Sequence, residues 1–184
     1  MKWPLLGLIA AVALSGESPA SRHAQIQRLT PGATLPALSG EYLTGRPALL
    51  PRDACGRAAL LLLGFTYDSR FPVEAWTKRF RQDFEKNPKV AFYEIPMIGG
   101  LARLGKWFID SGMRQGTPKA DQGNVITVYG GTDRWKRRVA FRDPKAAYLL
   151  LIDKTGKIVW QHAGDFDEKR YRELSAEVLK WTNF

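Results

Sequence analysis

Apolar runs that alternate with amphipathic stretches predict an α/β fold. Residues 58–65 form a continuous apolar run, which is typical of a central strand buried on both faces. In residues 72–87 three aromatic side chains recur at i, i+4 and i+8 among basic and polar residues, so we expect a helix there. Residues 90–95 alternate and favour a second strand. Strand, helix and strand in this order indicate a parallel crossover unit.

The last third of the chain has the clearest signals. Residues 148–152 are an apolar strand, and Asp153 to Gly156 supply a tight turn. Residues 158–160 return as the antiparallel partner, and Asp167 opens a terminal amphipathic helix. Between the two halves we expect an amphipathic helix at 101–113, a strand at 125–129 and helical turns at 132–139. The elements together predict an α/β domain with a central mixed sheet flanked by helices.

Composition limits the classes of partner. The chain has 184 residues and is 45% apolar, enough for one globular domain. Its net charge of +10 indicates an acidic partner: nucleic acid, anionic lipid or an acidic protein face. Two histidines and one cysteine do not make a metal-binding pattern, and no cofactor is indicated. No Ser/His/Asp arrangement or phosphate-binding loop supports hydrolase chemistry.

The N-terminal segment resembles an export signal. Lys2 supplies a basic start, residues 3–14 are apolar, and small residues follow. The apolar run is shorter than the about 20 residues that span a bilayer, but if uncleaved it would tether the protein. We therefore expect residues 1–24 to be a signal peptide or membrane anchor plus linker, and residues 25–184 to be the domain. The location would be periplasmic or at the periplasmic face of the inner membrane. A buried N-terminal helix is the alternative.

Two segments carry a family resemblance. The ending Leu151-Ile152-Asp153-x-x-Gly156-x-Ile158-x-Trp160 resembles the closing segment of thioredoxin-like proteins. Residues 29–66 resemble the lead-in of peroxiredoxins and of membrane-tethered, TlpA-like thioredoxins. The resemblance implies a thioredoxin-like fold. It also implies reactive cysteines just after the strand at 58–65.

Those cysteines are missing. In thioredoxin spacing the two positions fall on Arg70 and Val73, and in peroxiredoxin spacing the attacking position falls on Ser69. Ala147 stands where thioredoxins carry a proline. Thiol–disulfide exchange needs a thiolate, and a serine hydroxyl without an adjacent base is a poor nucleophile. We expect the usual site to be redox-inactive.

The order of segments over residues 60–181 resembles the ATP-ten family of ATP synthase assembly factors. Members combine a peroxiredoxin-like fold with loss of the active-site cysteines and carry a basic, Leu/Phe-rich insert after the second strand. The counterpart of that insert is Leu101 to Arg114, and the counterpart of the Tyr-Leu-x-Asp-x-x-x-x-Ile-x-Trp ending is Leu150/Leu151-x-Asp153…Ile158-x-Trp160. The resemblance implies an assembly factor or chaperone for a membrane protein rather than an enzyme.

Two patches are the candidate contact surfaces for a membrane protein client or an anionic membrane surface. Their residues are Arg103, Lys106, Trp107 and Phe108 in the first, and Arg134, Lys136, Arg137 and Arg138 in the second. The aromatic side chains would meet an apolar segment, and the basic ones headgroups or acidic side chains. The alternative is that the helix packs its apolar face on the sheet and the basic run is a solvated face.

Two other functions are open. Cys55 could act in a single-cysteine thiol redox protein or peroxiredoxin-like sensor, with Arg52 and Arg57 lowering its pKa, although it precedes the strand rather than following it. Basic residues interleaved with Trp135 would suit nucleic-acid phosphates and base stacking, but an export signal argues against nucleic acid as a partner. The sequence does not indicate an oligomeric state.

Overall fold

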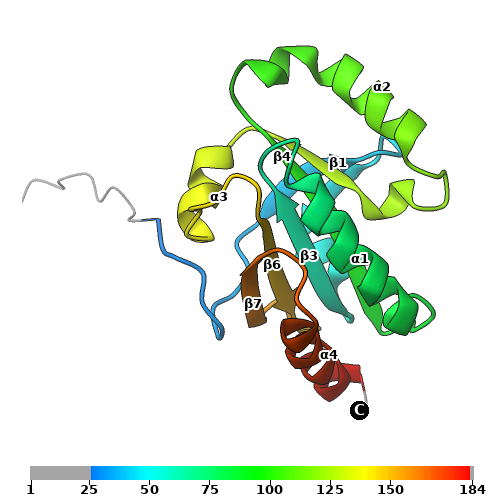
Figure 1. Ribbon diagram of the computed structural model, residues 1–184, viewed down its shortest axis with the longest axis vertical. Helices are drawn as coiled ribbons and strands as arrows, with labels where there is room; N and C mark the ends of the chain where they lie inside the picture. Colours follow the sequence, from blue (N-terminus) through cyan, green and yellow to red (C-terminus); the bar gives the residue numbers. More distant parts are fainter. Residues whose placement is uncertain (1–25, 183–184) are drawn as a thin grey trace, which may run out of the picture.

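A computed structural model describes residues 26–182, apart from the side chains of residues 101–103 (Figure 1). The strands are β1 (Leu38–Tyr42), β2 (Pro47–Leu50), β3 (Ala58–Gly64), β4 (Val90–Ile98), β5 (Ile126–Tyr129), β6 (Ala147–Ile152) and β7 (Ile158–Gly164). The helices are α1 (Arg70–Phe84), α2 (Lys106–Gly116), α3 (Thr132–Arg138) and α4 (Glu168–Thr182), with the 3₁₀ turns η1 (Arg52–Ala54), η2 (Gly100–Gly105) and η3 (Gln122–Asn124). The expected α/β fold is confirmed.

The sheet has the order β2-β1-β5-β4-β3-β6-β7. β3 pairs in parallel with β4, which pairs in parallel with β5, whereas β6 is antiparallel to β3 and β7 to β6. The expected crossover from β3 through α1 to β4 is present, and so is the β6–β7 hairpin. In its turn Asp153 accepts hydrogen bonds from Thr155 and Lys157, and Gly156 has a φ of 85°.

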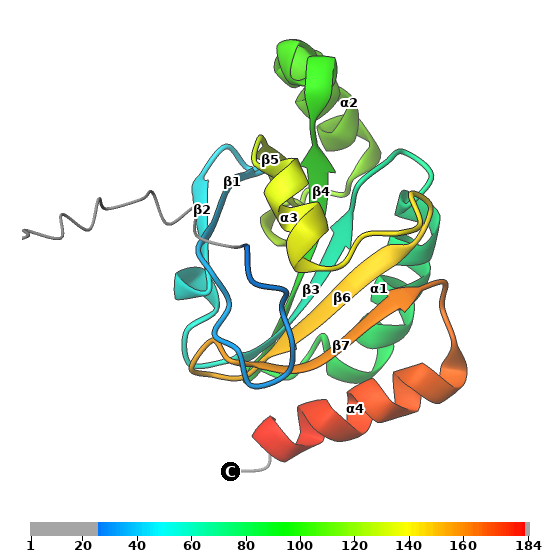
Figure 2. The ribbon, with the colours of Figure 1, turned by 90° about the vertical axis from the view of Figure 1, so that its left-hand side faces the viewer.

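β3 lies at the centre of the core. Leu60 to Leu63 are fully buried, and successive side chains of a strand point to opposite faces. Leu60 and Leu62 pack with α1 and α4 on one face. Leu61 and Leu63 pack with the lead-in segment and α3 on the other face, which Figure 2 turns toward the viewer. The apolar run therefore forms a strand buried on both faces, as expected.

The two helices on the first face are amphipathic and joined by polar contacts. α1 buries Trp76, Phe80 and Phe84, and α4 buries a matching stripe. Between them the Tyr171 hydroxyl donates to Asp83 Oδ2 at 2.6 Å. That hydrogen bond holds the pKa of Asp83 below its usual value.

The lead-in is more regular than the sequence indicated. Residues 38–50 form the β1–β2 hairpin, and β1 joins the sheet antiparallel to β5. A Cβ on Gly40 would lie 2.6 Å from Ile126 Cγ2 and 2.7 Å from the Thr127 carbonyl oxygen. Only glycine allows this close approach of β1 to β5.

The N-terminal prediction lies outside the described residues: segment 1–24, interpreted as a signal peptide or anchor, belongs to residues of which the structure gives no account. Within residues 26–182, every helix is too short or too polar to cross a membrane.

Phe80→Ala tests the α1 face of the core. The Phe80 ring is fully buried, with its centroid 4.9 Å from that of Phe84 and 6.3 Å from that of Phe92. Truncation should lower the free energy of unfolding by about 3–5 kcal/mol. The control Lys78→Ala, on the exposed side of the same helix, should change it by less than about 0.5 kcal/mol. Urea unfolding of both variants measures this, and equal losses would contradict the assigned face.

Candidate functional site

The loop before α1 occupies the place where the sequence comparison puts reactive cysteines. Ser69 is fully buried, and its Oγ donates to the Thr66 carbonyl oxygen at 2.7 Å and accepts from the Thr66 N–H at 3.2 Å. Val73 is buried as well, and Arg70 is exposed. The Ser69 hydroxyl is thus committed to closing the loop.

The outer surface of this loop is aromatic. The Arg70 guanidinium carbon lies 4.2 Å from the ring centroid of Tyr67 and 4.6 Å from that of Phe71. Both rings are more than half exposed. Stacking of this kind contributes about 0.5–1 kcal/mol at an exposed site. The loop in which the family resemblance implies reactive cysteines therefore exposes two aromatic rings to solvent.

Cys55 lies at the other end of β3. It is exposed in the turn between η1 and β3, whereas the loop before α1 follows the strand. The two arginines expected to assist it are engaged elsewhere: Arg52 Nε pairs with Asp53 at 3.1 Å, and Arg57 Nη2 donates to the Asp53 carbonyl oxygen and to the Tyr93 hydroxyl. Both guanidinium groups thus have partners other than Cys55.

The helix α2 faces the sheet with charged residues. Asp110 is buried, and its carboxylate accepts a hydrogen bond from the Tyr129 hydroxyl at 2.7 Å. Lys106 Nζ lies 2.5 Å from Asp110 Oδ2 and 3.3 Å from Glu41 Oε2. The hydrogen bond with Asp110, followed by the one with Glu41, raises the pKa of Lys106, so the ammonium group stays charged at neutral pH.

A third residue of the same face extends this contact. Arg114, at i+8 from Lys106, donates from Nε to the Leu43 carbonyl oxygen at 2.7 Å, and its Nη2 lies 3.8 Å from Glu41. We call Lys106, Asp110 and Arg114 the polar latch of α2. Lys106 was expected to meet acidic groups of a partner, but its carboxylate neighbours belong to this chain.

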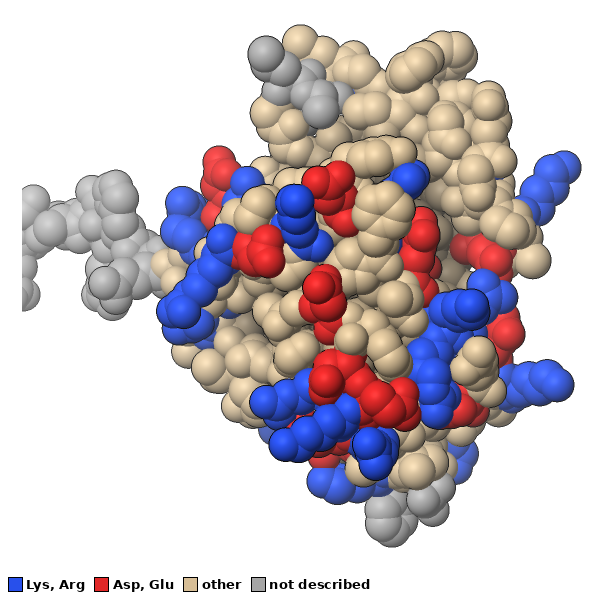
Figure 3. Space-filling model, in the orientation of Figure 1, with Lys and Arg blue, Asp and Glu red and all other residues tan. Residues whose placement is uncertain are grey.

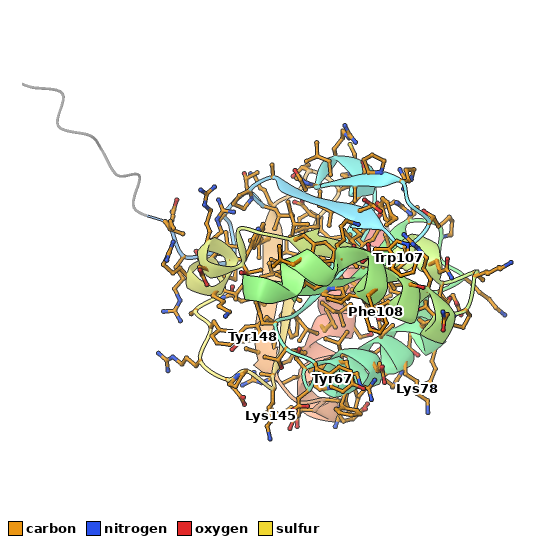
Figure 4. The ribbon with its side chains drawn as sticks, turned by 90° about the horizontal axis from the view of Figure 1, so that it is seen from above. Tyr67, Lys78, Trp107, Phe108, Lys145 and Tyr148 are labelled. Carbon is orange, nitrogen blue, oxygen red and sulfur yellow. The ribbon has the colours of Figure 1, made fainter. Side chains whose placement is uncertain are left out.

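Three large apolar residues of α2 and of the preceding turn point to solvent. Leu104, Trp107 and Phe108 are 88%, 78% and 77% exposed, so the alternative in which they pack on the sheet is wrong. On the face shown in the space-filling view, the charged side chains gather over the lower part of the molecule and few lie at this end (Figure 3). Seen from above, Phe108 lies on the side of α2 toward Tyr67 (Figure 4). Exposed apolar patches of this kind mark sites of interaction.

The basic run on α3 divides between surface and core. Arg134 and Arg137 are exposed. Lys136 and Arg138 are half-buried, with their charged groups each 4.9 Å from a ring centroid, that of Phe141 and that of Trp135 respectively. Burial, followed by repulsion from Arg134, lowers the pKa of Arg138.

Trp135 is itself buried in the core. The idea that it interleaves with basic residues to stack on nucleic-acid bases is therefore wrong.

The structure separates the expected contact residues and adds others. Trp107 and Phe108 share the outer surface of α2, the basic run lies on a different helix, and the side chain of Arg103 is outside the described part of the structure. Sequence reasoning missed the polar latch, although its i, i+4, i+8 spacing is visible. It also missed Tyr67 and Phe71.

Comparison with known proteins gives a fold. No family model matches the sequence, and no curated protein was found to be similar in sequence. Many solved structures are similar in backbone, and the following three each align over nearly their whole length. The thioredoxin domain of a thiol-disulfide oxidoreductase from Bacteroides vulgatus has a TM-score of 0.55 at 18% identity and covers 82% of this chain and 99% of its own. The chain has a thioredoxin-like fold.

Two further structures extend this likeness. The exposed lipoprotein thioredoxin Etrx1 from Streptococcus pneumoniae has a TM-score of 0.52 at 15% identity, covering 77% of this chain and 99% of its own. BsSco, a member of the Sco family of cytochrome c oxidase assembly proteins, has a TM-score of 0.59 at 11% identity, covering 85% and 98%. Identities this low establish the fold and leave the chemistry to the residues of this chain.

Asp110→Asn tests the polar latch. The amide can still accept from Tyr129 but loses the charge that pairs with Lys106, so the attachment of α2 should weaken by about 1–3 kcal/mol. Amide hydrogens of α2 should then exchange about tenfold faster or more, as measured by hydrogen exchange with mass spectrometry. Asp133→Asn, an exposed site on α3, should leave α2 unchanged. Equal exchange in both variants would show that the latch does not hold the helix.

Proposed function

We propose that this protein is a redox-inactive binding protein with a thioredoxin-like fold, which assists assembly of a membrane protein by holding one of its apolar segments on the outer face of α2. The observation that carries the proposal is the orientation of α2. Its charged residues contact the sheet edge, and its two aromatic residues, Trp107 and Phe108, are in water. This orientation is the reverse of that expected for a surface helix of a globular domain.

The polar latch prevents α2 from turning its aromatic side chains toward the sheet. Glu41 and Tyr129 lie beneath α2, so rolling the helix to bury Trp107 would place apolar side chains on a carboxylate and a phenol and would strip Asp110 of its partners. Burying each large apolar side chain against a partner contributes up to about 1.5–3 kcal/mol. The energy of that burial is therefore available to a partner, because the fold itself cannot use it.

The absence of a thiol after β3 supports binding rather than exchange. The single cysteine of the chain precedes β3, and Ser69 at the corresponding position is buried and hydrogen-bonded to its own loop. The structural likeness to BsSco, described as an oxidase assembly protein, supports an assembly role by analogy, as does the resemblance to ATP synthase assembly factors. We place the domain on the exported side of a membrane, where Arg134 and Arg137 would face acidic headgroups or acidic partner residues.

A photoreactive amino acid at position 107 tests the proposal in cells. We expect adducts with one or a few membrane proteins, identified by mass spectrometry. The matched probe at position 179 of α4, another exposed apolar position, should give none of these adducts. Adducts only with lipid would assign the surface to the membrane itself, and adducts only within the chain would remove the basis of the proposal.

The double variant Trp107→Ser/Phe108→Ser should lose the adducts formed by a probe at position 104, at least about tenfold in yield, because the partner loses most of the apolar area it buries. The free energy of unfolding should change by less than about 0.5 kcal/mol, since both side chains are exposed. A stability loss of several kcal/mol would instead show that these side chains belong to the core.

The second candidate function rests on the exposure of Cys55. With dithiothreitol as reductant, the protein should not accelerate the reduction of a disulfide-containing substrate, and Cys55→Ser should behave identically. Peroxide consumption should likewise be the same for both proteins. Activity that disappears in Cys55→Ser would overturn the redox-inactive proposal and favour the single-cysteine thiol protein.

A further inference from the structure

A cavity of about 270 Å³ opens at the end of the sheet where β3 and β4 begin, at the opposite ends of these strands from α2. Its wall includes Tyr42, Arg46, Asp53, Arg57, Glu85 and Asn124. These side chains come from the β1–β2 turn, η1, the start of β3, the end of α1 and η3. The proposed function does not involve any of them.

The two acids of the wall are already neutralised. Asp53 Oδ2 accepts hydrogen bonds from the Leu49 N–H at 3.0 Å and from the Tyr42 hydroxyl at 3.2 Å, and its Oδ1 pairs with Arg52. Burial alone would raise the pKa of Asp53, but these contacts hold it below its usual value. Glu85 pairs with Arg81, whose Nε lies 3.0 Å from its Oε1. Neither Arg52 nor Arg81 lines the cavity.

The two arginines of the wall have no matching acid. Arg57 is half-buried, and its Nη2 donates to two neutral oxygens, the Asp53 carbonyl and the Tyr93 hydroxyl, each at 3.0 Å. The Arg46 guanidinium carbon lies 4.1 Å from the Tyr42 ring centroid. Among residues 26–182, no carboxylate lies within 4.0 Å of either guanidinium group. The two carboxylates of the wall, those of Asp53 and Glu85, pair with Arg52 and Arg81 instead.

Arg46 and Arg57 therefore line one cavity without an ion pair among the described residues, while Asp53 and Glu85 pair with Arg52 and Arg81. Partial burial makes the charge of Arg57 unfavourable until an anion enters, because the surrounding protein screens it less than water does. The hydrogen bonds of Arg57 fix the plane of its guanidinium, which leaves its remaining N–H donors in a set direction. The side-chain amide of Asn124 has no hydrogen-bond partner among the described residues and supplies a further donor at the rim.

We propose that this cavity binds the carboxylate or phosphate group of a small molecule, held between Arg57 and Arg46 with Asn124 donating at its edge. Planar guanidinium groups match the two oxygens of such oxyanions and bind them by charge-assisted hydrogen bonds. The rest of the wall includes the side chains of Tyr42, Phe84 and Tyr93, against which an organic part attached to the anion would lie. Tyr42 of the wall is the chain neighbour of Glu41 and Leu43, which contact the polar latch, so the cavity and the attachment of α2 share this segment.

Isothermal titration calorimetry with the full chain tests the site, at constant ionic strength with chloride as the background anion. Inorganic phosphate, glycerol 3-phosphate and succinate are the probes, so that the phosphate and carboxylate arms are separated. We expect saturable binding of at least one probe. Arg46→Gln should weaken that binding about tenfold, because one charge-assisted contact is lost while the fold is kept, Arg46 being exposed.

Arg137→Gln on α3 is the matched control, since it removes the same charge from another exposed site and should leave binding unchanged. Arg57→Lys should weaken binding as well. In NMR spectra of the unmodified protein, addition of the ligand should shift the side-chain amide signals of Asn124, which would locate the site. If Arg46→Gln and Arg137→Gln weaken binding equally, the anion is attracted by the net charge of the protein and the proposed site is wrong. No saturable binding of any probe at millimolar concentration would overturn it too.

Discussion

Burial of β3 on both faces is the constraint that organises this molecule. Four consecutive leucines, Leu60 to Leu63, are fully shielded from water, and burying each contributes about 1.5–3 kcal/mol. A strand of this kind needs a covering layer on each side. The helices α1 and α4 supply one layer, and the lead-in with α3 supplies the other. With both faces covered, α2 lies beyond the ends of the strands (Figure 1).

The position of α2 determines its chemistry. At this edge the sheet offers a carboxylate, a phenol and a backbone carbonyl, from Glu41, Tyr129 and Leu43, and the helix meets them with Lys106, Asp110 and Arg114. Apolar contacts do not fix direction, whereas hydrogen bonds and ion pairs do. The polar latch thus keeps the face of α2 that carries Trp107 and Phe108 turned toward solvent. A helix packed by its apolar face would bury more apolar area. The exposure of Trp107 therefore fits the proposal that a partner binds there.

Local patterns were enough to predict β3, α1, the β6–β7 hairpin and α4, because each has its own periodicity, turn residues or cap. Asp167, for example, accepts from the Arg170 N–H at the start of α4. The β1–β2 hairpin and the orientation of α2 could not be found in this way. β1 pairs with β5, more than eighty residues later, and the partners of Asp110 and Lys106 on the sheet lie far away in the chain. Periodicity shows that a helix has two faces, but only distant residues decide which is buried.

The loop before α1 is closed by contacts among its own residues and with β3. A Cβ on Gly64 would lie 2.8 Å from Ser69 Oγ, so the end of β3 approaches that hydroxyl closely. Thr66 holds the same hydroxyl through its backbone and also donates from Oγ1 to the Pro144 carbonyl oxygen at 2.5 Å, which joins the loop to the segment before β6. These contacts make the position structural. The exposed groups nearby are aromatic rings on this loop and on α2, and rings of this kind bind apolar surface rather than transfer electrons.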